Sequence, residues 1–136
     1  MAVSSLEEAI RVMMTGSTSL TLVPDARITH ASRVQSTVLP AITFELDSIE
    51  VQTINSNPLY RMSLTVSCIA DTSVDALAIV AQVRLAIRAL SGGTVSPYEF
   101  FSAIYTGHTI EAVQVSEGDE HAPMIGNVTF DLLYDE

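Results

Sequence analysis

The sequence is poor in positive charge. It contains six arginines and no lysine against 16 acidic residues, which leaves a formal net charge of −10 over 136 residues. A surface of this sign repels the phosphates of nucleic acids. We therefore exclude a protein that reads DNA sequence or clamps the DNA backbone.

Cysteine is almost absent as well. The single cysteine, Cys68, has no second thiol in the chain with which to form a disulfide. It alternates with Val66 and Ala70 on one side of a strand-like pattern, which predicts a small buried apolar residue in a reducing compartment. A reactive thiol is the less favoured interpretation.

Long apolar runs are missing. No segment approaches the roughly 20 apolar residues that a membrane span requires. The first eight residues, MAVSSLEE, lack the basic and apolar regions of a secretory signal. We expect a protein that is made and kept in the cytoplasm and that contacts no membrane.

Patterns typical of catalysis and cofactor binding are also missing. The histidines His30, His108 and His121 fall in separate segments without metal-ligand spacing, and we interpret them as exposed loop or turn residues. Gly92-Gly93 follows a predicted helix instead of opening one, so we interpret it as a helix C-cap and not as a phosphate loop. The sequence therefore predicts no enzyme, no cofactor and no metal site.

What the chain does have is apolar content. Hydrophobic residues make up 48% of the sequence, charged residues only 16%, and the mean hydropathy is +0.36. A length of 136 residues fits a single domain over residues 1–136, with a core that needs no disulfide or metal. Because monomers rarely expose large apolar patches, the surplus indicates burial between subunits.

Periodicity predicts a first helix, a hairpin and a second helix. Ser5 and Glu8 have the spacing of a capping box, and period-two alternation is clearest over residues 60–70. Asp71-Thr72-Ser73 supplies cap residues for the second helix. The predicted elements are a helix over 5–15, strands over 42–46 and 60–70 joined by a turn at 55–58, and a helix over 74–90.

The remaining pattern predicts a short helix and two closing strands. Ser96-Pro97-Tyr98-Glu99 combines capping-box spacing with proline at the first helical position, which predicts a helix over 96–105 that ends at Gly107. Strands follow over 109–115 and 126–134. The fold class is α+β: a mainly antiparallel four- to five-stranded sheet covered on one face by a long helix and an N-terminal helix, plus one short helix.

The second helix is apolar on two sides. One stripe is predicted to pack on the sheet, while the opposite side still carries leucines beside two arginines, which indicates contact with a second partner. A helix buried within a single domain is the alternative. The stripe comprises Ala76, Val80, Val83, Ile87 and Leu90, and the opposite side, a candidate subunit interface, comprises Leu77, Ala81, Arg84, Leu85 and Arg88.

Four segments carry a resemblance to a known family. They are Leu6-Glu7-Glu8-Ala9-Ile10, Leu39-Pro40-Ala41-Ile42, the block from Arg61 to Thr72 with the Ala-rich helix that follows, and Phe130-Asp131-Leu132-Leu133-Tyr134. In this order, nearly end to end, the chain resembles the tail-terminator (tail-completion) proteins of long-tailed bacteriophages, which include the lambda-type minor tail protein U. The segment 93–105 is longer than the family pattern.

The resemblance implies a structural virion protein of the tail or neck, assembled in the host cytoplasm. It implies a homo-hexameric ring that sits on the last ring of tail-tube protein, stops its polymerisation and meets the head-side connector or stopper protein. A tail sheath would be a further partner if the tail is contractile. DNA would pass through the ring without sequence-specific binding, and an acidic bore would suit that passage.

Two polar segments are candidates for axial contacts or the lumen. One is the stretch from His30 to Thr37, with His30 and Arg33, and the other is the acidic loop with Glu117, Asp119 and Glu120. The acidic loop lacks the spacing of an EF-hand, so we interpret it as a solvated hairpin tip. Two alternatives remain: another head–tail neck protein, and a small ligand-binding α+β oligomer, which would need a concave pocket with convergent polar groups.

Overall fold

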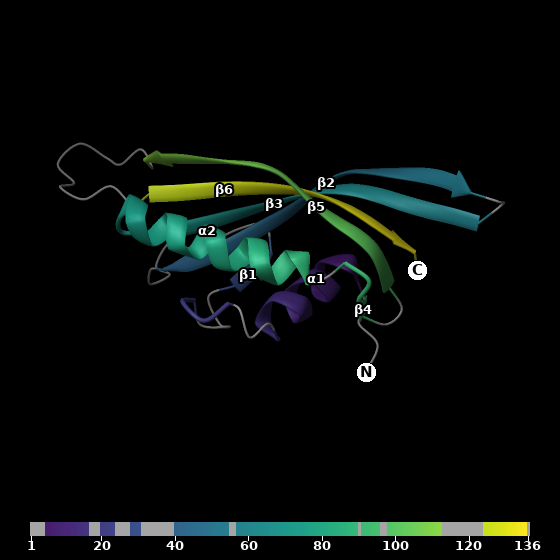
Figure 1. Cartoon of the computed structure of the whole chain (residues 1–136), viewed down its shortest axis with the longest axis horizontal. Coiled ribbons are helices and arrows are strands. Elements are labelled where there is room, and N and C mark those ends of the chain that lie inside the picture. Colours follow the sequence, from purple (N-terminus) through teal and green to yellow (C-terminus); the bar gives the residue numbers. More distant parts are fainter. Residues whose placement is uncertain are drawn as a thin grey trace.

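A twisted sheet of six strands forms the body of the molecule, with two helices on one side (Figure 1). The computed structural model describes residues 5–16, 20–23, 28–30, 40–54, 57–89, 91–95, 98–112 and 124–135. The elements are α1 (Leu6–Thr15), β1 (Ile28–His30), β2 (Ala41–Ile54), β3 (Asn57–Ala70), α2 (Ser73–Arg88), β4 (Thr94–Val95), β5 (Tyr98–Ala112) and β6 (Met124–Asp135).

The strands are arranged in the order β1-β2-β3-β6-β5-β4. All neighbours are antiparallel except β1, which runs parallel to β2. The predicted hairpin is confirmed, since β2 and β3 pair from Ala41↔Ile69 to Ile54↔Asn57. The α+β class with a mainly antiparallel sheet is therefore confirmed, with six strands instead of four to five.

The core lies between the sheet and the helices. Along β3, Met62, Leu64, Val66 and Cys68 are at most 1% exposed, whereas the residues between them face outward. This alternation is the period-two pattern expected of a half-buried strand. On the outward face, the Ser67 hydroxyl donates to Asn127 Oδ1 at 2.7 Å, so polar groups pair across strands there.

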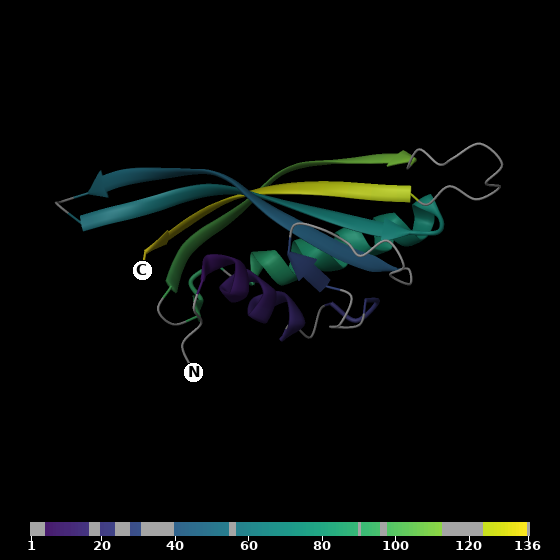
Figure 2. The same ribbon diagram turned by 180° about the vertical axis from the view of Figure 1, so that it is seen from behind.

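The helices cover only part of the sheet. Helix α2 contacts β3, β5 and β6, and α1 contacts β1 and α2. A 16-residue helix is about 24 Å long, whereas a 14-residue strand reaches about 48 Å. The outer half of the β2–β3 hairpin extends beyond both helices (Figures 1 and 2), so the expectation of a long helix covering the sheet face is not confirmed.

Both predicted helix starts have a side-chain cap. The Ser5 hydroxyl accepts a hydrogen bond from the Glu8 backbone N–H at 3.2 Å, and the Thr72 hydroxyl accepts one from the Asp75 N–H at 3.1 Å. These bonds satisfy backbone donors that have no partner within the helix.

The glycine pair has a different role from the predicted C-cap. Helix α2 ends at Arg88 with Ala89 as its cap. Gly92, at φ 79°, lies instead in the turn between α2 and β4, next to β5. Its N–H donates to the Phe100 carbonyl at 2.9 Å, and the Phe100 N–H donates to the Gly93 carbonyl at 2.8 Å.

The prediction of a short helix over 96–105 is wrong. Residues Tyr98–Ala112 form β5, which pairs with β6. The register shifts at Phe101 and at Thr106, where one extra residue bulges from β5. Each bulge reverses which residues of β5 face the core, so residues 98–112 do not show the period-two alternation that identifies a strand. Pairing with β6 therefore outweighs the capping pattern at Ser96–Glu99 that predicted a helix.

Candidate functional site

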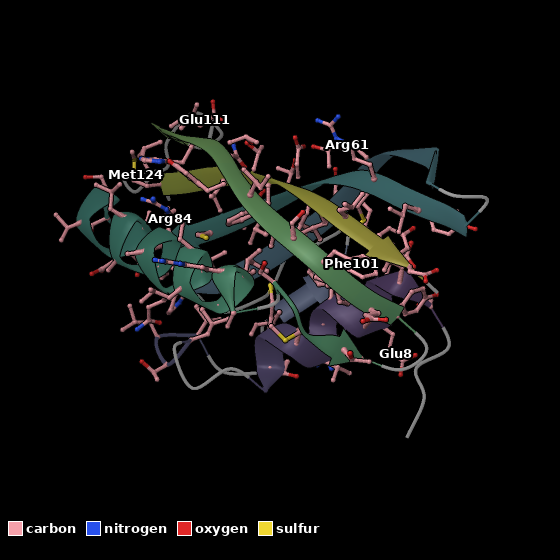
Figure 3. The ribbon with its side chains drawn as sticks, turned by 45° about the vertical axis from the view of Figure 1, so that its right-hand side comes forward. Glu8, Arg61, Arg84, Phe101, Glu111 and Met124 are labelled. Atoms are coloured by element: carbon pink, nitrogen blue, oxygen red, sulfur yellow. The ribbon has the colours of Figure 1, made fainter. Side chains whose placement is uncertain are left out.

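A groove of about 540 Å³ lies between α2 and β5. It brings together four of the five α2 residues predicted to face a partner. Figure 3 places Arg84 on α2 and Arg61 on the face of the sheet away from the helices. The groove is lined by Ala81, Arg84, Leu85 and Arg88 from α2, by Ala103, Ile104 and Tyr105 from β5, and by Phe130 from β6.

The two faces of α2 differ sharply in exposure. Ala76, Val80, Val83 and Ile87 are at most 2% exposed, which confirms the stripe predicted to pack on the sheet, apart from Leu90, which lies outside the described residues. On the other face, Leu77 is 45% and Leu85 is 55% exposed. The alternative of a helix buried within one domain therefore does not fit this chain.

The floor of the groove is aromatic and held in place by three contacts. The guanidinium carbon Cζ of Arg84 lies 3.9 Å from the centroid of the Tyr105 ring, within range of a cation–π interaction. The Tyr105 hydroxyl is hydrogen-bonded to His108 Nδ1. The Tyr105 ring also meets Phe130 edge-on, with centroids 6.1 Å apart and an interplanar angle of 62°. The guanidinium group of Arg84 thus lies over a tyrosine ring that is held in place by His108 and Phe130.

The charge of the groove is opposite to that of the whole chain. Arg84 and Arg88 lie four residues apart on α2, which places them one above the other on the same helix face. Both are exposed, and they are two of only six basic residues in a chain of net charge −10. An apolar floor with two guanidinium groups suits a partner segment that carries both apolar side chains and carboxylates.

The remaining predicted site residues are not brought into the groove. Leu77 is exposed on α2 but does not line it. His30 is the last residue of β1, in register with Phe44, so its placement in a loop is wrong. His108 lies in β5 and not in a loop or turn, although its side chain is exposed as expected. Arg33, Glu117, Asp119, Glu120 and His121 lie outside the described residues.

Sequence reasoning missed the half of the groove that comes from the sheet. Ala103, Ile104 and Tyr105 were assigned to a helix, so their proximity to α2 was not foreseen. The signal was the run Phe-Phe-Ser-Ala-Ile-Tyr-Thr, because aromatic and β-branched residues favour strands.

The described residues otherwise hold little reactive chemistry. Burial raises the pKa of the Cys68 thiol to about 12, so this side chain stays protonated and unreactive near neutral pH. Among the described side chains, no three His, Cys, Asp or Glu residues gather in a way that suits a metal ion. No helix in the described part of the chain is long and apolar enough to cross a membrane.

Of the comparisons with known proteins, the comparison of structures finds a match. No family model matches the sequence, and no curated protein matches it. Among solved structures, the fold is similar to that of a chain in the virion of a native gene transfer agent (GTA) particle, with a TM-score of 0.70 and 14% sequence identity. The similarity covers 96% of this chain and 96% of that chain, so the whole fold is shared and not only a motif.

Proposed function

We propose that this chain is a structural, non-enzymatic protein of a virion, and more closely that it is a tail terminator. The observation that carries the proposal is the end-to-end likeness in fold to a chain of a virion particle. The resemblance in sequence to phage tail terminators, which covers nearly the same length, leads independently to the same class of protein. At 14% identity the likeness alone fixes no role, so the finer assignment depends on the sequence pattern and the surface.

In the proposed assembly, identical copies form a closed ring. A ring requires a heterologous interface, in which one surface of each copy meets a different surface of the next. The exposed face of α2, with Leu77, Ala81, Arg84, Leu85 and Arg88, supplies one of these surfaces. Its exposed apolar residues account for part of the apolar content that exceeds the needs of a single core. The number of copies, six, is what the family resemblance implies.

The ring caps the last ring of tail-tube protein, stops its polymerisation and meets the head-side connector or stopper protein, with a tail sheath as a further neighbour in a contractile tail. DNA passes through the lumen. The net charge of −10 per copy supports this passage, because phosphates are repelled from an acidic bore. His30, Arg33, Glu117, Asp119 and Glu120 are proposed for the lumen or for the axial contacts.

Native mass spectrometry and electron microscopy of the purified protein test the ring. We expect an annulus of six copies with a bore wide enough for a DNA duplex. Leu85→Glu places a charge in the groove and should dissociate the ring. Val74→Glu is the matched control, since Val74 is on the same helix, 73% exposed and outside the groove, and this variant should assemble normally.

Mixing the ring with purified tail-tube subunits tests the terminator role. A terminator should limit tube length when added in substoichiometric amounts, and the Leu85→Glu variant should not. A ring that leaves tube length unchanged is what another neck protein would give. Charge reversal of Glu117, Asp119 and Glu120 should impair genome delivery, and unaltered delivery would remove that loop from the lumen.

A further inference from the structure

The sheet has an open edge along most of β5. Strand β4 pairs only with Tyr98 and Glu99, and Gly92 and Gly93 bond the backbone of Phe100. From Ser102 to Ala112, no strand among the described residues pairs with β5 on the side away from β6.

The opposite edge is open along the outer part of β2. Strand β1 pairs only with residues Ile42, Thr43 and Phe44. From Glu45 to Ile54, the described part of the chain holds no strand on the side of β2 away from β3. This part of β2 lies in the section of the hairpin that extends past the helices (Figure 2).

Open edges of this length favour pairing with another strand. An edge strand presents unpaired N–H and C=O groups, and folded monomers normally protect such an edge by covering it or keeping it short. Among the residues that the structure describes, no strand pairs with these two stretches, each of which is roughly ten residues long, twice the usual length of a whole strand. They also lie on opposite sides of one sheet, as a head-to-tail contact between identical copies requires.

The apolar side chains beneath the sheet are only partly covered at the same two edges. Leu46, Leu64, Phe130 and Tyr105 are successive partners across β2, β3, β6 and β5, so they form one row. Leu64 and Phe130 in the middle are at most 2% exposed, whereas Leu46 and Tyr105 at the ends are only half-buried. A strand of a second copy laid along either edge would cover the exposed part of Leu46 or of Tyr105.

Strand direction is also compatible with this contact. Strands β2, β3, β6 and β5 alternate in direction across the sheet, so β5 runs opposite to β2. A rotation about an axis that runs broadly along the strands preserves their direction. The next copy therefore presents a β2 that is antiparallel to β5 of the first, and the alternation continues from copy to copy.

We infer that copies of this chain join by β-strand addition: β5 of one copy, between Ser102 and Ala112, pairs antiparallel with β2 of the next, between Glu45 and Ile54. The inference rests on the proposed ring and specifies its contact. The incoming strand lies along the groove and covers Leu85 and the Tyr105 ring, so the strand pairing and the α2 contact form one interface.

Amide hydrogen exchange on the full-length protein tests the pairing. The assembled wild type is compared with the monomeric Leu85→Glu variant, or with wild type diluted to monomer if that variant still assembles. We expect outward-pointing amides within 102–112 and 45–54 to exchange more than about tenfold more slowly in the assembly. Peptides from the central part of β3 are the internal control and should be equally protected in both states.

The outcomes separate the two proposals. Slowed exchange at both edges supports strand addition. A ring in which either edge exchanges as fast as in the monomer overturns the strand pairing and leaves the proposed function intact. A protein that stays monomeric at every concentration overturns both.

Discussion

Helix α2 approaches the sheet closely at Gly126, and replacing this glycine with alanine provides a strong test of the packing. A Cβ atom at this buried position in β6 would lie 2.7 Å from Val80 Cγ2, 2.9 Å from Ile110 Cδ1 and 3.6 Å from the Ala76 carbonyl oxygen. The Ile110 methyl is the far end of a flexible side chain and can move. Val80 cannot, because a β-branched residue in a helix has essentially one allowed rotamer. The helix itself must therefore shift outward.

The expected cost follows from two opposing effects. Overpacking of a core by one methyl group typically costs about 1–3 kcal/mol. Alanine also restricts the unfolded chain more than glycine does, which returns about 0.4–1 kcal/mol. We therefore expect Gly126→Ala to lower the free energy of unfolding by about 0.5–2 kcal/mol, equivalent to a Tm lower by about 2–8 °C for a domain of this size.

The assay is a double-mutant cycle measured by urea unfolding. Wild type, Gly126→Ala, Val80→Ala and the double variant are compared at one fixed protein concentration, because assembly stabilises the folded state by mass action. Val80→Ala removes the methyl group that blocks the new Cβ, so Gly126→Ala should cost at least 0.5 kcal/mol less, as a rough lower bound, in that background. A Gly126→Ala variant as stable as wild type, or the same cost in both backgrounds, would refute the reasoning.

Three further predictions concern the thiol, the helix cap and the groove. Because burial raises the pKa of Cys68 from 9.0 to about 12, its thiol should resist a disulfide reagent at pH 8 until the chain unfolds. The unfolded chain loses this proton first as the pH rises above 9.0, so chemical denaturation should also show stability falling between pH 9.0 and about 12. Thr72→Ala removes the cap of α2 and should cost about 0.5–2 kcal/mol in urea unfolding, whereas Thr94→Ala, at an exposed position, should cost less than about 0.5 kcal/mol. Arg84→Ala removes an exposed cation–π contact with Tyr105, so it should cost the monomer at most about 1 kcal/mol while weakening the proposed ring in native mass spectrometry. A large loss of monomer stability would contradict the proposed role of Arg84 in the interface.

The sequence was sufficient to predict those elements that depend on contacts between residues close together in the chain. The helix starts at Ser5 and Thr72 were predictable because a cap is a contact within four residues. The hairpin was predictable because an unbroken alternation along β3 specifies both a strand and its buried face. The same logic identified the α2 side of the groove, since residues on one helix face follow from the helical period.

The residues that the sheet contributes to the groove could not be predicted from any local sequence pattern. The bulges at Phe101 and Thr106 are defined by the pairing of β5 with β6, a strand that comes later in the chain. The insertion of β6 between β3 and β5 is likewise set by packing over a long sequence separation. Residues such as Tyr105 and Phe130 therefore meet for reasons that only the complete sheet reveals.

The central place of β6 also determines when the groove between α2 and β5 can form. A nascent chain that has emerged only as far as β5 has no strand to join β3 to β5, and the floor of the groove still lacks Phe130. The chain must therefore complete its sheet before the groove has all of its lining residues. A chain that is still being synthesised therefore lacks the proposed interface until β6 is in place.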